Sequence, residues 1–122
     1  MGLTLFFDTY ALMELVKGNP AYEQFADSTI VTTRLNLMEF HYGLLRTSDK
    51  ETADRYFDAL LPHTINVSDA LIKQSNLFKY RQKDRRLSYV DAISYTFACA
   101  LGIHFLTGDK QFEDLPNVEY VK

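Results

Sequence analysis

The amino-acid sequence predicts an α/β fold, a three-layer α/β/α sandwich with a central parallel sheet of about five strands. Two observations support this class. Short apolar or β-branched segments alternate along the chain with segments whose apolar residues recur at helical spacing. The connections between most of the apolar segments are long enough for the crossovers that parallel strands require. The 122 residues have the length of one domain, which we expect to span residues 1–122.

The first predicted strand, residues 3–7, is a short apolar run. A helix is expected to begin at Asp8-Thr9, because apolar residues follow at helical spacing: Leu12, Leu15 and Val16. The Gly-Asn-Pro sequence at 18–20 ends this helix, and its proline can begin a short helix over residues 22–25.

The second predicted strand, residues 29–32, consists mostly of β-branched residues. A helix is expected from Leu35 onward, with an apolar stripe formed by Leu37, Phe40, Leu44 and Leu45. A further helix covers residues 49–61, and Pro62 ends it.

The second half of the chain continues the alternation. Ser68 and Ser88 are each expected to cap the N-terminus of a helix, and Gly102 is expected to end the later one. The remaining predicted strands are residues 64–67, 103–107 and 118–121.

Composition excludes several classes of protein. With 47% hydrophobic and 24% charged residues, the chain is expected to fold rather than to be disordered. No apolar run approaches the ~18 residues of a membrane span, and no basic start precedes an apolar segment as in a signal peptide. The single cysteine, Cys99, can form no internal disulfide. We therefore expect a cytoplasmic protein without membrane contact.

Four carboxylates stand near the ends of predicted strands. Asp8 and Asp109 directly follow the first and the fourth strand, Glu39 lies within the helix after the second, and Asp91 comes three residues after Ser88. Ligands of parallel α/β sheets bind at the carboxyl ends of the strands, where the strand order reverses. If the first and fourth strands are neighbours, these acids are expected to meet there.

A cluster of carboxylates without His or Cys is a ligand set for Mg²⁺ or Mn²⁺ rather than zinc. Two carboxylates ~5 Å apart repel each other by about 3 kcal/mol at an effective dielectric constant of about 20. A group of four therefore either takes up protons or binds a divalent cation. Such a cation can activate water and polarise a phosphodiester, which indicates a metal-dependent nuclease.

Three of the acids also have an ordinary structural explanation. Asp8 and Asp109 stand at helix N-cap positions, and Asp91 occupies the third position after a Ser cap, where a carboxylate favours the helix dipole. Glu39 has no such explanation, because it lies within a helix among apolar residues and a buried carboxylate without a partner is costly. The four together favour a metal site.

The four acids lie in the segments Phe7-Asp8-Thr9, Asn36-Leu37-Met38-Glu39, Leu87-Ser88-Tyr89-Val90-Asp91-Ala92 and Leu106-Thr107-Gly108-Asp109-Lys110-Gln111-Phe112. These segments resemble the four acidic motifs of the PIN-domain ribonucleases, and more narrowly those of VapC-type toxins of prokaryotic type II toxin–antitoxin pairs. The motifs occur in the family's order, and the resemblance covers nearly the whole chain. It implies a PIN-like sheet in which the predicted strands, numbered along the chain, lie in the order 3-2-1-4-5.

The resemblance also implies the roles of the site residues. Asp8, Glu39, Asp91 and Asp109 would hold one or two Mg²⁺ or Mn²⁺ ions and activate water for endoribonuclease cleavage of RNA. Thr9 and Thr107 match hydroxyl positions that support this cluster. One departure from the family is Gln111, since many relatives carry a further Asp there; Glu113 and Asp114 lie nearby in the sequence.

The resemblance implies two protein partners. One is a cognate antitoxin whose C-terminal segment covers the acidic groove. The other is a second copy of the chain in a homodimer, for which aromatic residues offer apolar surface: Tyr42, Tyr56 and Phe57.

The net charge of −3, from 13 basic and 16 acidic residues, argues against a generic nucleic-acid-coating protein, so contacts with RNA have to be local. Residues 81–86 contain four basic residues and one acid, which suits either the RNA backbone or a solvated helix end. The candidate phosphate contacts are Arg34, Arg85, Arg86 and Lys110.

The sequence leaves two alternatives to a toxin. A housekeeping PIN-domain nuclease for RNA processing would use the same acids. A phospho-accepting receiver domain would have similar length and layering, but it needs a pair of acids after the first strand, where this chain has Asp8-Thr9. It also needs a lysine in a loop after the fifth strand, whereas Lys122 is the last residue.

Overall fold

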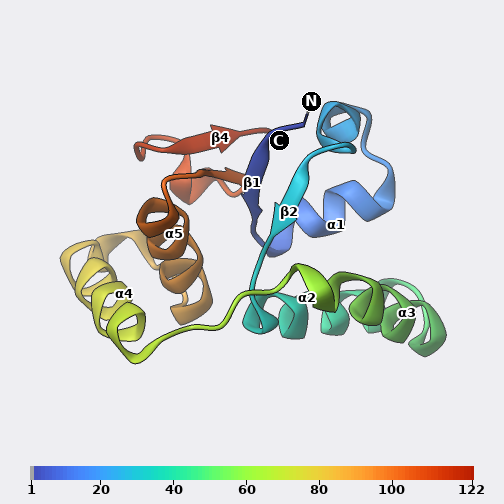
Figure 1. Ribbon diagram of the computed structural model, residues 1–122, viewed down its shortest axis with the longest axis horizontal. Helices are drawn as coiled ribbons and strands as arrows, with labels where there is room; N and C mark the ends of the chain where they lie inside the picture. Colours follow the sequence, from blue (N-terminus) through green and yellow to red (C-terminus); the bar gives the residue numbers. More distant parts are fainter. Residues whose placement is uncertain (1) are drawn as a thin grey trace.

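The computed structural model describes residues 2–122 and contains a parallel sheet of four strands between two groups of helices (Figure 1). The strand order is β2-β1-β3-β4. The strands are β1 (Thr4–Phe7), β2 (Thr29–Val31), β3 (His104–Thr107) and β4 (Val118–Tyr120). The predicted fold class is confirmed, and so is the expectation that the first strand and the strand at 103–107 are neighbours.

The helices match the predicted alternation. They are α1 (Thr9–Lys17), α2 (Arg34–Thr47), α3 (Lys50–Leu60), α4 (Asp69–Arg81) and α5 (Tyr89–Leu101). Four short 3₁₀ helices join them: η1 (Pro20–Phe25), η2 (Leu61–His63), η3 (Lys83–Arg85) and η4 (Lys110–Phe112). Ser68 and Ser88 cap α4 and α5 as expected, and Gly102 ends α5 in the left-handed conformation at φ +70°.

Two hydrophobic cores lie on opposite faces of the sheet, because neighbouring residues of a strand point to opposite sides. Leu5 and Phe7 of β1 face the core formed with α1, α2 and α3. Phe6, between them, faces the core formed with α5 and η4, where the rings of Phe105 and Phe112 lie 4.8 Å apart. Burial on both faces explains why residues 5–7 of this strand are all apolar.

The predicted strand at residues 64–67 is not formed. The segment makes a single parallel bridge between Thr64 and Thr32, in which the Thr32 N–H donates to the His63 carbonyl and the Ile65 N–H donates to the Thr32 carbonyl. Pairing stops there because the partner strand ends: Thr33 already caps α2. The bridge lies beside β2, at the position that the predicted strand order assigns to this segment.

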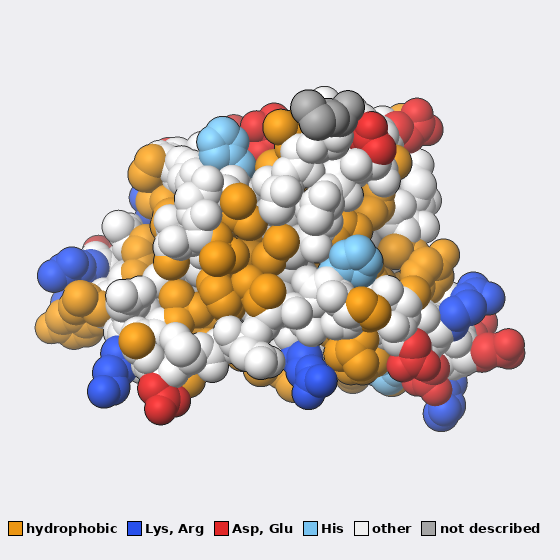
Figure 2. Space-filling view, viewed as in Figure 1, with side chains coloured by type: hydrophobic (Ala, Val, Ile, Leu, Met, Phe, Trp, Pro, Cys, Tyr) orange, Lys and Arg blue, Asp and Glu red, His pale blue; other side chains and the backbone are white. Residues whose placement is uncertain are grey.

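The two groups of helices give the molecule a broad shape in which α4 and α5 lie at one side and α1, α2 and α3 at the other (Figure 1). On the same face, hydrophobic side chains gather between α5 and β2, and charged side chains lie at the periphery (Figure 2). No helix within residues 2–122 combines the length and the apolar character that crossing a membrane requires.

Candidate active site at the carboxyl edge of the sheet

Asp8 lies at the carboxyl end of β1 and is 5% exposed. Its Oδ1 accepts a hydrogen bond from the Ala11 backbone N–H at 2.8 Å, which caps α1. Its Oδ2 accepts a hydrogen bond from the Thr107 hydroxyl at 2.5 Å. The pKa of Asp8 is raised to about 7, chiefly by burial and in smaller part by the nearby carboxylates of Asp91 and Asp109, against the effect of the two hydrogen bonds.

Asp109 follows β3 and is joined to Asp8 through one hydroxyl. The Asp109 backbone N–H donates to Thr107 Oγ1 at 3.0 Å, while that hydroxyl donates to Asp8. The Asp109 carboxylate accepts a hydrogen bond from the Gln111 N–H at 3.0 Å and caps η4. Thr107 therefore positions both acids, consistent with its predicted supporting role.

Glu39 reaches the same edge from α2 and is half-buried. Its Oε1 accepts a hydrogen bond from the Thr9 hydroxyl at 2.7 Å. Burial is the main cause that raises the pKa of Glu39; the charge of Asp91 raises it as well, and the Thr9 hydrogen bond opposes the shift. Thr9, the other predicted supporting residue, thus orients this carboxylate.

Asp91 reaches the site from the first turn of α5. It forms a capping box with Ser88: Asp91 Oδ2 accepts from the Ser88 N–H, and the Asp91 N–H donates to the Ser88 hydroxyl, both at 3.0 Å. Burial raises the pKa of Asp91, with a further contribution from the charge of Asp109. Capping and participation in the cluster are therefore compatible for the same side chain.

The structure brings the four predicted acids together at one edge of the sheet. Asp91 is close enough to influence the pKa of both Asp8 and Glu39, and Asp109 that of Asp8 and Asp91. Burial is the largest cause of each raised pKa, and the charges of the neighbouring carboxylates add to it, which places negative charges near one another in a partly buried site. Carboxylate oxygens fit Mg²⁺ or Mn²⁺ in chemistry, although no three Asp, Glu, His or Cys side chains of residues 2–122 are already arranged to hold a metal ion.

A buried polar network contacts Thr9, the hydrogen-bond donor of Glu39; the sequence analysis did not predict this network. Asn36 Nδ2 donates to Ser94 Oγ at 2.9 Å and to Thr9 Oγ1 at 3.4 Å, and Asn36 Oδ1 accepts from the Thr33 hydroxyl at 2.7 Å. The Ser94 hydroxyl has one proton, and its shortest acceptor is the Val90 carbonyl at 2.7 Å.

These hydrogen bonds have one consistent direction. The Asn36 amide occupies an acceptor position of the Thr9 oxygen, so the Thr9 proton is directed to Glu39. Thr33 and Asn36 show the i, i+3 spacing of a helix cap. Ser94 is 58 residues away on α5, and no local pattern indicates that it meets them.

The predicted phosphate-contacting residues fall into two groups. Three are exposed near the carboxylates in sequence: Arg34 begins α2, Lys110 begins η4, and Arg86 follows η3. Arg85 is instead engaged within the protein, since its guanidinium donates to both Asp114 carboxylate oxygens, at 2.7 and 3.0 Å, and to the Gln111 carbonyl at 2.9 Å. Asp114, considered as a nearby acid, is thus paired with Arg85.

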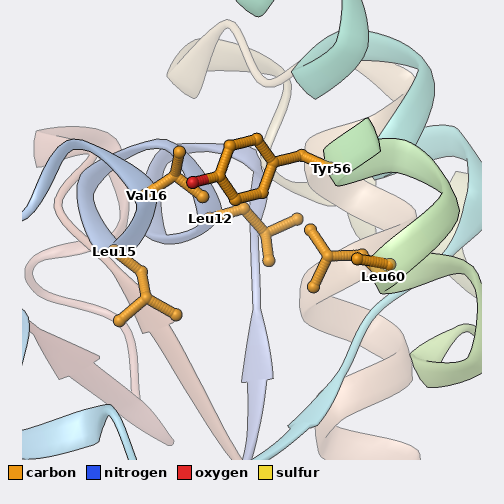
Figure 3. A pocket seen from close by; sticks show the side chains of 6 residues that line it. Leu12, Leu15, Val16, Tyr56 and Leu60 are labelled. Carbon is orange, nitrogen blue, oxygen red and sulfur yellow. The ribbon is translucent and has the colours of Figure 1, made fainter. Parts of the chain in front are cut away.

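An apolar pocket of about 310 Å³ lies between α1 and α3 (Figure 3). It is lined by Leu12, Leu15, Val16, Tyr56, Ala59 and Leu60. A second depression of about 460 Å³ shares Val16 and Tyr56 with it, so the two form a continuous concave surface. Of the residues predicted to offer a dimer surface, Tyr42 is exposed, whereas Tyr56 and Phe57 are half-buried.

The fold and the acid cluster together define a class of parallel α/β domain with a carboxylate site at the strand ends. The family model of the PIN domain matches residues 5–118, and the chain belongs to the PIN domain family. No curated protein matches this chain.

Several solved structures share the fold. VapC20 of Mycobacterium tuberculosis, described as a sarcin–ricin loop cleaving toxin, has a TM-score of 0.80 at 21% identity, with 98% of this chain and 99% of that chain covered. A toxin–antitoxin complex from Klebsiella pneumoniae has a TM-score of 0.75 at 22% identity, with 95% of this chain and 96% of that chain covered. DNA-bound VapBC from Salmonella typhimurium has a TM-score of 0.71 at 19% identity, with 98% of this chain and 97% of that chain covered. At these identities the likeness establishes the shared fold.

Proposed function

We propose that this protein is a Mg²⁺- or Mn²⁺-dependent endoribonuclease that acts as the toxin of a toxin–antitoxin pair. One observation carries the proposal: Asp8, Glu39, Asp91 and Asp109 converge at one sheet edge, and three of them have raised pKa values. Such a cluster is costly unless a cation compensates it. Membership of the PIN family and the toxin–antitoxin proteins among the structural neighbours support this assignment.

The four carboxylates would hold the cation, which when bound supplies charge to stabilise the phosphate and to acidify a water molecule. Thr107 keeps Asp8 and Asp109 in place, and Thr9 orients Glu39 and favours its ionised form. Hydrolysis by an activated water leaves a 3′-hydroxyl and a 5′-phosphate. The exposed side chains proposed to contact RNA phosphates are Arg34, Arg86 and Lys110; Arg85 would have to exchange Asp114 for a phosphate.

We propose three further properties of the toxin. An antitoxin segment restrains it by placing an arginine among the carboxylates, because a guanidinium supplies the charge that the cation otherwise provides. The apolar pocket between α1 and α3 is suited to apolar side chains of the same partner. The protein acts as a homodimer in the cytoplasm.

Induced expression tests the toxin role. The wild type is expected to arrest growth and to cleave RNA in the presence of Mg²⁺ or Mn²⁺. Asp91→Ala is expected to abolish both, and Asp84→Ala, which removes an exposed acid outside the cluster, is the matched control. Growth arrest by Asp91→Ala would contradict the proposed chemistry. RNA cleavage without growth arrest would favour a housekeeping nuclease. The absence of a short neighbouring reading frame that encodes an antitoxin would favour it as well.

A further inference from the structure

Two exposed tyrosines frame a depression between the end of α4 and the start of α5. Tyr80 and Tyr89 are each 69% exposed, the highest values among the large hydrophobic side chains of residues 2–122. The depression has a volume of about 340 Å³ and is lined by Asn76, Lys79, Tyr80, Lys83 and Tyr89. Its lining therefore combines aromatic rings, ammonium groups and an amide, without a carboxylate.

Two lysines of this surface form cation–π contacts with its two tyrosines. The ammonium nitrogen of Lys79 lies 5.0 Å from the ring centroid of Tyr89, which joins α4 to α5. The ammonium nitrogen of Lys83 lies 5.7 Å from the ring centroid of Tyr80. Each ring thus has an ammonium group over one face, while the tyrosine remains largely exposed to solvent. This arrangement suits a ligand that carries both flat rings and negative charge.

One tyrosine of the depression lies close in sequence to the carboxylate cluster. Tyr89 is the first residue of α5, and it follows Ser88, whose backbone N–H donates to the Asp91 carboxylate. The exposed Arg81 ends α4, and the exposed Arg86 lies in the connection from α4 to α5. Tyr89 and Asp91 thus belong to the same first turn of α5.

We propose that this surface, formed by Lys79, Tyr80, Lys83 and Tyr89 and called here the tyrosine platform, binds unpaired bases of a single-stranded RNA segment next to the cleavage site. Bases stack on the two rings, and the ammonium groups contact the phosphates. The identity of the ligand rests on the proposed ribonuclease function. The combination favours a nucleic acid strand over a protein segment, because every charge lining the depression is positive and Tyr89 shares the first turn of α5 with Asp91, a residue of the proposed cleavage site.

Fluorescence anisotropy with a labelled single-stranded RNA of about a dozen nucleotides tests the platform. EDTA is present, so binding is measured apart from cleavage. The double variant Tyr80→Ala/Tyr89→Ala is expected to weaken binding about tenfold or more, since stacking on each ring is lost. Tyr80→Phe/Tyr89→Phe, which keeps both rings, is expected to bind within about twofold of wild type.

Leu77→Ala provides a matched control, because Leu77 is 47% exposed on α4 but does not line the depression. It is expected to bind like wild type, and a blunt RNA duplex is expected to bind without sensitivity to Tyr80 or Tyr89. The platform is wrong if wild type does not bind the single strand, or if the double alanine variant binds it equally well.

A separate cleavage assay with Mn²⁺ distinguishes the two proposals. Tyrosine-dependent binding without cleavage by the wild type would retain the platform and refute the ribonuclease. If the wild type cleaves RNA but Tyr80→Ala/Tyr89→Ala binds the single strand as tightly as the wild type, only the platform is refuted.

Discussion

The hydroxyl of Thr107 donates a 2.5 Å hydrogen bond to the buried carboxylate of Asp8 and thereby ties β3 to β1 at the candidate active site. The same oxygen accepts the backbone N–H of Asp109. Two acids that are about a hundred residues apart in sequence are thus held by one side chain. Because hydrogen bonding to the charged form favours that form, Thr107 counteracts the rise in the pKa of Asp8.

Thr107→Val removes this hydrogen bond at nearly constant volume. We expect a loss of about 1.5–3 kcal/mol in the free energy of unfolding at pH 8, the range for a hydrogen bond to a charged group. Thr107→Ser keeps the hydroxyl and should lose less. Urea denaturation of the three proteins measures the difference, and a larger loss for Ser than for Val would show that the methyl group, not the hydroxyl, matters.

The raised pKa of Asp8 predicts a pH-dependent stability. The carboxyl has a pKa of 3.8 in the unfolded chain and about 7 in the folded protein. Between these values the folded protein retains a proton that the unfolded chain has released, so stability falls as pH rises from about 4 to about 7 and then levels off. The full effect is on the order of 4 kcal/mol.

Asp8→Asn removes the titrating group and tests this directly. Melting temperatures of wild type and variant, measured without divalent cations from pH 4 to pH 8, should diverge, with the wild type losing stability relative to the variant. Curves that run parallel across this range would contradict a raised pKa at Asp8.

A bound cation should reverse this loss. At pH 8, Mn²⁺ at about a hundredfold excess over its dissociation constant is expected to stabilise the wild type by about 2.7 kcal/mol, because it binds only the folded state. Asp8→Asn should show a much smaller rise in melting temperature. A wild-type melting curve indifferent to millimolar Mn²⁺ and Mg²⁺ would exclude the proposed metal site.

Local sequence could predict the acid cluster because each acid occupies a position defined by its own segment. Asp8 and Asp109 follow strands, and Asp91 follows a Ser cap; the topology of a parallel sheet then brings such positions to one edge. The capping interpretation is confirmed, since all three accept backbone N–H bonds. Capping leaves the same carboxylates free to take part in the proposed metal site.

Features that depend on distant partners could not be predicted in this way. Residues 64–67 have strand propensity, but a strand needs a partner, and β2 ends at Val31 before the pairing can extend. The contact of Asn36 with Ser94 likewise depends on how α2 and α5 pack, which neither helix pattern specifies.

Asn36 is predicted to be a positioning residue for Glu39. Asn36→Leu leaves the hydroxyls of Thr9, Thr33 and Ser94 without their amide partner, and we expect a loss of about 2–4 kcal/mol in stability together with weaker Mn²⁺ binding. Ser94→Ala removes the bonds of Ser94 with Asn36 and with the Val90 carbonyl but leaves the Asn36–Thr9 contact, so it should leave Mn²⁺ affinity near the wild-type value. Equal Mn²⁺ affinity in Asn36→Leu would contradict the positioning role.

Variants of Arg85 test whether its guanidinium has a structural role or binds RNA. Its guanidinium binds Asp114, the Gln111 carbonyl and Gln82, and the Asp114 pairing keeps the pKa of that carboxyl below its usual range. The Asp114 side chain is 71% exposed, so we expect Arg85→Ala to lower the free energy of unfolding by only about 1 kcal/mol, and by less at high salt.

Asp114→Asn is the matched variant, since it weakens the same pair while leaving the arginine in place. If the role of Arg85 is structural, both variants should lower stability and leave RNA affinity equally unchanged in the anisotropy assay. If Arg85 contacts a phosphate, Arg85→Ala alone should weaken RNA binding, and Asp114→Asn should strengthen it by releasing the guanidinium. The geometry favours the first result, because a phosphate would have to replace a bidentate carboxylate and a backbone carbonyl at once.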